Sequence, residues 1–140
     1  MSVEMDTANV IAAFSLFADL GGPELEQVVH VFEESWFVDG EPVLRQGLTG
    51  SGFYVIVEGS ASIRVNGVDR ATLGPGDYFG EISAMLGEAP VADIVARGQL
   101  RCLVLPAARL EEFLKSHPKI MFRLLQGETR KLRNTTRWLS

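Results

Sequence analysis

The chain has 140 residues, of which 46% are hydrophobic and 22% are charged, and its formal net charge is −5. These values are ordinary for one soluble globular domain with a sizeable core. Cys102 is the single cysteine, which excludes an internal disulfide and predicts a buried apolar side chain. The chain lacks a signal-peptide pattern and an apolar run of roughly 18 residues, so we expect a cytoplasmic protein without a membrane segment.

Charge is distributed unevenly along the chain. Residues 1–118 contain seven basic and 17 acidic side chains, whereas residues 119–140 contain six basic side chains and one acidic side chain, Glu128. A basic segment of this kind can contact nucleic acid, but this one lacks a recognition motif. We interpret it as a solvated helix face that complements an acidic body, and we expect no DNA-binding element within the chain.

Helical spacing comes first along the chain. Apolar residues recur at intervals of three and four within residues 8–37, and a Gly-Gly-Pro break at residues 21–23 separates two helices. Pro23 suits the first turn of the second helix. We therefore assign residues 8–35 to N-terminal helices.

The period changes to two in the next segment, residues 36–105. Short apolar stretches alternate with glycine-containing turns, and Asn66-Gly67 predicts a two-residue hairpin turn. Many short strands at close spacing favour a sheet closed on itself. We expect a β roll over residues 36–105.

Helical spacing returns in residues 106–139, with one short helix that ends at Pro118 and one long helix. Apolar and threonine side chains form a narrow seam along the long helix: Phe122, Leu125, Thr129, Leu132, Thr136 and Leu139. Such a seam pairs helices, although the threonines and Gly127 weaken it. We expect a homodimer or a partner protein to use Phe122, Leu125, Leu132 and Leu139.

Catalytic and metal-binding patterns are missing. His30 and His117 lie in predicted helices, and a metal site in a β barrel needs several histidines on strands. Ser51 and Ser62 are interpreted as loop and surface hydroxyls, and the pairs Glu33-Glu34 and Glu111-Glu112 as solvated helix faces. We expect no metal, no resident cofactor and no enzymatic activity.

Three stretches of the sequence together resemble one family. LFADLGGPELEQVVHVFEESWFVDGEPVLRQGLTGSGFYVIVEGSASIRV, LGPGDYFGEISAMLG and LEEFLKSHPKIMFRLL are similar to the cyclic-nucleotide-binding domain of the catabolite activator protein and of kinase regulatory subunits. The resemblance covers about residues 14–139. It implies a mainly β fold, a double-stranded β-helix of the jelly-roll type with N-terminal helices and a long C-terminal helix that often forms dimers.

The resemblance also implies a ligand site for a cyclic nucleotide or another small molecule. Glu81 matches the carboxylate that accepts a bond from the ribose 2′-hydroxyl, and Gly80 allows a close backbone approach. The implied site consists of Phe79, Gly80, Glu81, Ile82, Pro90, Val91 and Ala92, with Thr135 and Thr136 at the positions that contact the purine.

One position departs from the family pattern. The family's phosphate-pairing arginine falls on Pro90, and its hydroxyl neighbour falls on Val91. Burial of an unpaired phosphate costs several kcal/mol, and proline lacks a backbone donor. We expect weak or absent binding of cAMP and cGMP, or a different, less anionic ligand. We expect Arg97 to pair with Asp93 or to face solvent.

Two alternative functions remain for the domain. It could be a ligand-independent dimerisation module, or the sensor part of a longer transcription regulator.

Overall fold

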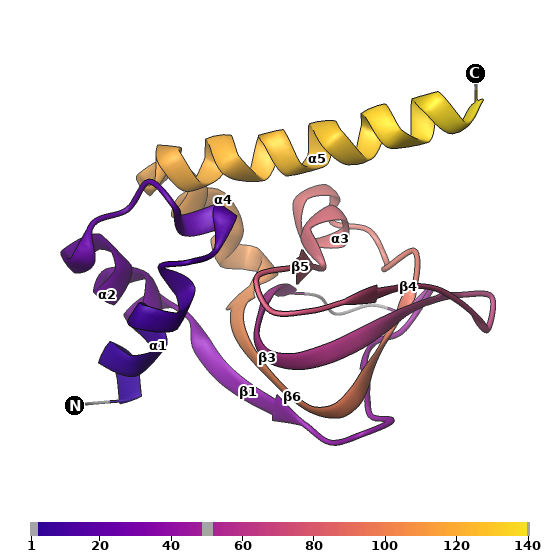
Figure 1. The fold of residues 1–140 in the computed structure, drawn as a ribbon. Coiled ribbons are helices and arrows are strands. Elements are labelled where there is room, and N and C mark those ends of the chain that lie inside the picture. Colours follow the sequence, from indigo (N-terminus) through magenta and orange to yellow (C-terminus); the bar gives the residue numbers. More distant parts are fainter. Residues whose placement is uncertain (1–2, 49–51, 140) are drawn as a thin grey trace.

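A computed structural model describes the backbone of residues 3–48 and 52–139 and the side chains of residues 6–48 and 52–137. The N-terminal helices pack beside a β roll, and the long C-terminal helix crosses above the roll (Figure 1). Three elements precede the roll: α1 (Val3–Ile11), the 3-10 helix η1 (Ser15–Phe17) and α2 (Gly22–Val31). The C-terminal helices are α4 (Ala107–Ser116) and α5 (Pro118–Leu139).

Six strands and one short helix form the roll. They are β1 (Glu33–Phe37), β2 (Pro42–Leu44), β3 (Gly52–Val65), β4 (Val68–Leu73), β5 (Tyr78–Phe79), α3 (Glu81–Leu86) and β6 (Asp93–Pro106). The long strands β3 and β6 run antiparallel, from the pair Gly52–Pro106 to the pair Arg64–Asp93. Strands β1 and β2 pair with β6, and β4 and β5 pair with β3.

A glycine lets the two long strands bend together. Their register shifts twice between Ile56 and Ser60, and Gly59 lies between these positions with φ of +87°. A Cβ atom on Gly59 would lie 2.2 Å from the carbonyl oxygen of Gln99. Glycine is therefore required at this close backbone approach.

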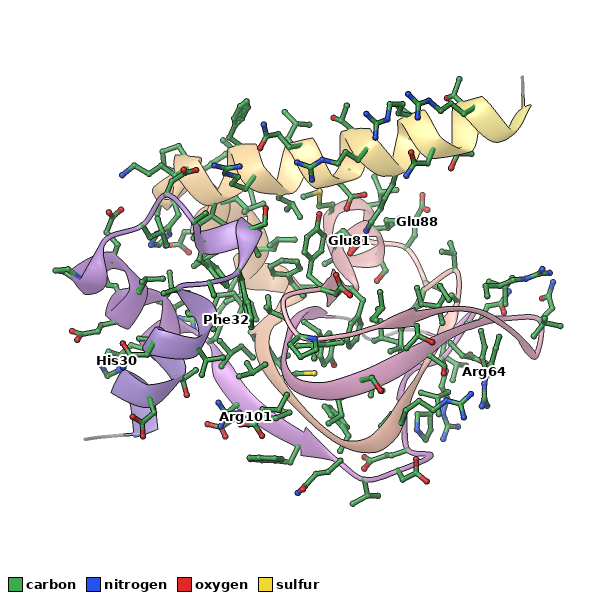
Figure 2. All side chains as sticks on the ribbon, viewed as in Figure 1. His30, Phe32, Arg64, Glu81, Glu88 and Arg101 are labelled. Carbon is green, nitrogen blue, oxygen red and sulfur yellow. The ribbon has the colours of Figure 1, made fainter. Side chains whose placement is uncertain are left out.

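Alternation along the long strands builds two apolar clusters. Phe53, Val55 and Val57 of β3 pack against the helices, whereas Ile56 and Ala61 face the inside of the roll. Side chains alternate between the two faces of a strand, so each long strand serves both clusters. Phe32 (Figure 2) joins the helical cluster edge-on to Phe113, with ring centroids 5.2 Å apart.

The fold class expected from the sequence is confirmed: an antiparallel β roll with N-terminal helices and a long C-terminal helix. The hairpin prediction is also confirmed, because Asn66 and Gly67 have φ of 52° and 80° between the paired residues Val65 and Val68. Cys102 is buried inside the roll, and burial raises the pKa of its thiol to about 12.

Two predicted boundaries are wrong. The first helix begins at Val3, before residue 8, and the β region begins at Glu33, before residue 36. Glu33 and Glu34 therefore lie on a strand and not on a helix, since they pair with Val104 and Leu103 of β6. Pairing with a distant strand overrides the local helical spacing.

The remaining sequence interpretations have mixed outcomes. Ser62 is buried and accepts a hydrogen bond from Arg97, so it is not a surface hydroxyl, while Ser51 lies outside the described residues. Glu111 and Glu112 are exposed on α4 as expected. None of the helices in the described ranges is long and apolar enough to cross a membrane.

Candidate functional site

A cavity of about 490 Å³ lies between the roll, α3 and α5. Its wall combines apolar side chains of the roll with the segments 80–83 and 90–92, the 3-10 helix η1 and residues of α5. This volume is in the range of small-ligand sites. The cavity is open: Met85 and Leu86, which could have filled it, are 50% and 62% exposed and do not line it.

Backbone geometry positions Glu81 at this cavity. Gly80 caps the N-terminus of α3 with φ of +84°, and a Cβ atom there would lie 2.1 Å from the carbonyl oxygen of Gly52. The turn from β5 into α3 therefore lies directly against β3. As the first residue of α3, Glu81 lines the cavity with only 4% of its surface exposed (Figure 2).

The two oxygens of the Glu81 carboxylate differ. Oε1 lies 3.1 Å from Nζ of Lys131, which comes from α5. Oε2 is buried and has no hydrogen-bond partner among the described residues. A buried acceptor without a partner costs about 1–3 kcal/mol. The site is therefore ready to accept a hydrogen bond from a molecule in the cavity.

Lys131 connects several groups at this end of the cavity. Its Nζ also lies 3.3 Å from Oε1 of Glu128 and 4.8 Å from the centroid of the Tyr78 ring. Burial alone would lower the pKa of Lys131, but attraction to Glu81 and Glu128 outweighs it and the pKa is raised. The pKa of Glu128 is raised mainly by burial, and repulsion from the charge of Glu81 adds to this effect.

A second part of the cavity wall, the segment 90–92, is apolar, and we call it the Pro90 end. Pro90 is buried, lacks a backbone N–H, and its carbonyl accepts a hydrogen bond of 2.9 Å from the backbone N–H of Gly47. Val91 and Ala92 complete this end. Glu88 is exposed and does not line the cavity (Figure 2), so it does not oppose an anion there. Neither a cation nor a hydroxyl comes from this segment.

The structure brings together most of the residues predicted for the site. The following line the cavity: Phe79, Gly80, Glu81, Ile82, Pro90, Val91 and Ala92. Thr135 and Thr136 do not line it. Both are exposed, and their hydroxyls donate to the carbonyls of Lys131 and Leu132 in their own helix. Both residues therefore lie outside the cavity in this structure, because α5 carries them past it.

Three arginines in the β region could have supplied a cation to the cavity, but none of them does. Arg97 does not pair with Asp93: it donates to Asp69 on β4 and to Ser62, whereas Asp93 accepts a bond from the backbone N–H of Gln46. Arg64 also pairs with Asp69. Neither these two nor Arg45 lines the cavity.

Sequence reasoning missed the contribution of α5. Arg123, Gly127, Arg130 and Lys131 all line the cavity, although these basic residues were interpreted as a solvated face. One signal was available. A Cβ atom on Gly127 would lie 1.9 Å from the hydroxyl oxygen of Tyr78, so the mid-helix glycine marks the point where α5 passes closely over the roll.

The predicted seam lies on the exposed surface of α5. Phe122, Leu125 and Leu132 are 53%, 62% and 67% exposed, and the side chain of Leu139 lies outside the described ones. None of these residues lines the cavity. The seam and the cavity are therefore separate features of the same helix.

Solved structures of known proteins share this fold. The catabolite activator protein of Thermus thermophilus has a TM-score of 0.81 and 27% identity, over 89% of this chain and 61% of that protein. The N-terminal domain of a transcriptional regulator from Streptomyces coelicolor has a TM-score of 0.70 and 26% identity, over 94% of both chains. The regulatory subunit of a cAMP-independent protein kinase A from Trypanosoma brucei has a TM-score of 0.77 and 22% identity, over 90% of this chain and 46% of that one.

The chain thus spans about three fifths of the Thermus protein. A family model for the cyclic nucleotide-binding domain matches residues 34–117, which include the roll, the segment 79–92 and α4. This match agrees with the fold and with the position of Glu81 in the cavity. The chain belongs to the cyclic-nucleotide-binding domain family.

Proposed function

We propose that this domain is a non-enzymatic regulatory module that binds a small hydroxyl-bearing ligand in the cavity beneath α5, and binds cAMP and cGMP weakly or not at all. The observation that carries the proposal is Oε2 of Glu81, a buried acceptor without a partner on the wall of an open cavity. A ligand hydroxyl that donates to this oxygen removes the cost of leaving it unpaired.

The Pro90 end argues against a cyclic phosphate. A cyclic phosphate carries one negative charge, and it gains most of its binding energy from charge-assisted hydrogen bonds. The segment 90–92 provides three apolar side chains, and its first residue has no N–H. An anion placed there loses water without gaining a partner. A ligand with little charge at that end fits better.

The comparisons are compatible with such a ligand. The Trypanosoma protein of the same fold belongs to a cAMP-independent kinase, so the fold alone does not specify cAMP. The Thermus and Streptomyces proteins favour a second aspect of the proposal, in which this domain is the sensor part of a longer transcription regulator.

An alternative function is a ligand-independent dimerisation or protein-interaction module. The exposed apolar side chains of Phe122, Leu125 and Leu132 favour it, because they lie on α5 away from the cavity. Light-scattering mass over a concentration series tests this alternative. A dimer that forms without ligand supports it, and a strict monomer at high concentration contradicts it.

Calorimetric titration with adenosine, cAMP and cGMP tests the main proposal. Wild-type protein should bind adenosine more tightly than either cyclic nucleotide. The variant Glu81→Gln should lose about tenfold or more in adenosine affinity, because it weakens a hydrogen bond to a charged acceptor. Glu88→Gln is the matched control, since Glu88 is exposed in the same segment and does not line the cavity.

Thermal melts of both variants establish that they remain folded. Micromolar or tighter binding of cAMP by the wild-type protein would show that the Pro90 end accepts a phosphate, and it would overturn the proposal. Equal losses of adenosine affinity in Glu81→Gln and Glu88→Gln would show that Glu81 does not contact the ligand.

A further inference from the structure

Helix α5 places three cationic side chains on the wall of the cavity: Arg123, Arg130 and Lys131. Two of them are neutralised. The guanidinium of Arg123 donates through two nitrogens to Asp19, at 2.8 and 2.9 Å. Lys131 is paired with Glu81 and Glu128. Arg130 forms no ion pair with any of the described residues.

The acidic groups of the cavity wall are already engaged. Asp77 accepts a hydrogen bond of 2.8 Å from the backbone N–H of Gly74, and Glu81 is paired with Lys131. Arg130 is therefore the cation of the cavity wall that no carboxylate pairs with among the described residues, and its guanidinium is available to an anionic group.

We infer that Arg130 supplies from α5 the anion contact that Pro90 removes from the segment 79–92, so that the ligand combines a hydroxyl for Glu81 with an anionic group directed toward α5. The inference rests on the proposed function, because both contacts belong to the same cavity. It names the ligand class as a small hydroxylated anion whose charge lies away from Pro90. A guanidinium suits phosphate and carboxylate groups because its N–H donors match two oxygens at once.

A nucleoside and the matching nucleotide isolate the contact between Arg130 and the anionic group. Adenosine and adenosine 5′-monophosphate (AMP) differ by one phosphate, which rotates freely and is not fused to the ribose as in cAMP. Calorimetry should show that the wild-type protein binds AMP about fivefold to tenfold more tightly than adenosine, a modest factor because Arg130 is exposed and its charge is screened. High salt should reduce AMP binding and leave adenosine binding unchanged.

Two variants separate the contact from the general charge of α5. Arg130→Gln should remove the preference for AMP over adenosine. Arg133→Gln should leave both affinities unchanged, since Arg133 is exposed on the same helix and does not line the cavity. If both variants lost the same amount of AMP affinity, the preference for AMP would come from the overall charge of α5, and the inference would be overturned.

The outcomes distinguish the inference from the proposed function. Adenosine binding that depends on Glu81, without a preference for AMP, overturns the inference alone. AMP binding that depends on Arg130 supports it even if adenosine binding is too weak to measure. Failure of both probes to bind contradicts both statements.

Discussion

Two parts of the cavity wall, the Glu81 end (residues 80–83) and the Pro90 end (residues 90–92), differ in chemistry and in backbone packing. At one end, Glu81 is a buried carboxylate that is ion-paired with Lys131 and held by a turn packed against β3. At the other end, Pro90 and Val91 are apolar, and a Cβ atom on the neighbouring Gly87 would meet nothing within 4 Å. The fold thus combines a closely packed acceptor in one part of the wall with an apolar segment in the other.

Under the proposed function, the difference means that recognition of a hydroxyl and recognition of a phosphate are separable in this fold. The proposed hydroxyl acceptor, Glu81, depends on the start of α3 and on its packing against β3. The phosphate contact that the family resemblance implies would come from one side chain after α3, where this chain has Pro90. Charge at the cavity comes instead from Arg123, Arg130 and Lys131 of α5.

The largest expected effect concerns the glycines at the two ends of α3. Gly80→Ala should destabilise the protein by about 3 kcal/mol or more, because a clash with a backbone carbonyl adds to the cost of the left-handed conformation. Gly87→Ala should cost only about 1–2 kcal/mol, since its φ of +66° is strained but its surroundings are empty.

Urea unfolding of both variants measures this difference in free energy. Equal costs in the two variants would mean that the Glu81 end is packed no more tightly than the Pro90 end. The comparison between the two ends would then concern charge alone.

A smaller effect should appear in the pH dependence of stability. The pKa of Glu128 is raised from 4.5 by burial and by Glu81, so the folded state binds this proton more tightly than the unfolded state. Stability should therefore increase as the pH falls from the raised pKa of the folded state toward 4.5.

The variant Glu128→Gln isolates this contribution. The stability of the wild-type protein relative to Glu128→Gln should rise by less than about 1 kcal/mol between neutral pH and pH 4.5, because Glu128 is partly solvated. The pKa of Asp19 is lowered by its hydrogen bond to Arg123, so the contribution of Asp19 to stability is lost at low pH. This loss is the same in both proteins and cancels in the difference between them. A difference in melting temperature that is constant with pH, or that changes in the opposite direction, would contradict the assignment.

Local patterns in the sequence predicted the roll and half of the site. Gly80 and Glu81 are adjacent to the short helix that positions them, so their arrangement is encoded within a few residues. The hairpin at Asn66-Gly67 is equally local.

The contribution of α5 could not be predicted in this way. The rotation of α5 about its axis and its height above the roll decide that Lys131 meets Glu81, 50 positions earlier in the chain, while Thr135 and Thr136 miss the cavity. These quantities depend on tertiary packing, in particular on Ile120 and Leu124 beneath the first half of the helix. For the same reason, the partner of Arg97 was not predicted: Arg97 is exposed, which is one of the two expected outcomes, but it pairs with Asp69 of β4 and not with Asp93.

The most direct test of the central claim restores the cation that Pro90 replaces. Calorimetry should compare cAMP and adenosine binding in the wild-type protein and in Pro90→Arg, with a melt to confirm folding. The account predicts that Pro90→Arg raises the affinity for cAMP by about tenfold or more and leaves adenosine binding unchanged. A folded Pro90→Arg variant whose cAMP affinity equals that of the wild-type protein would contradict the claim that the missing cation separates this cavity from a cyclic-nucleotide site.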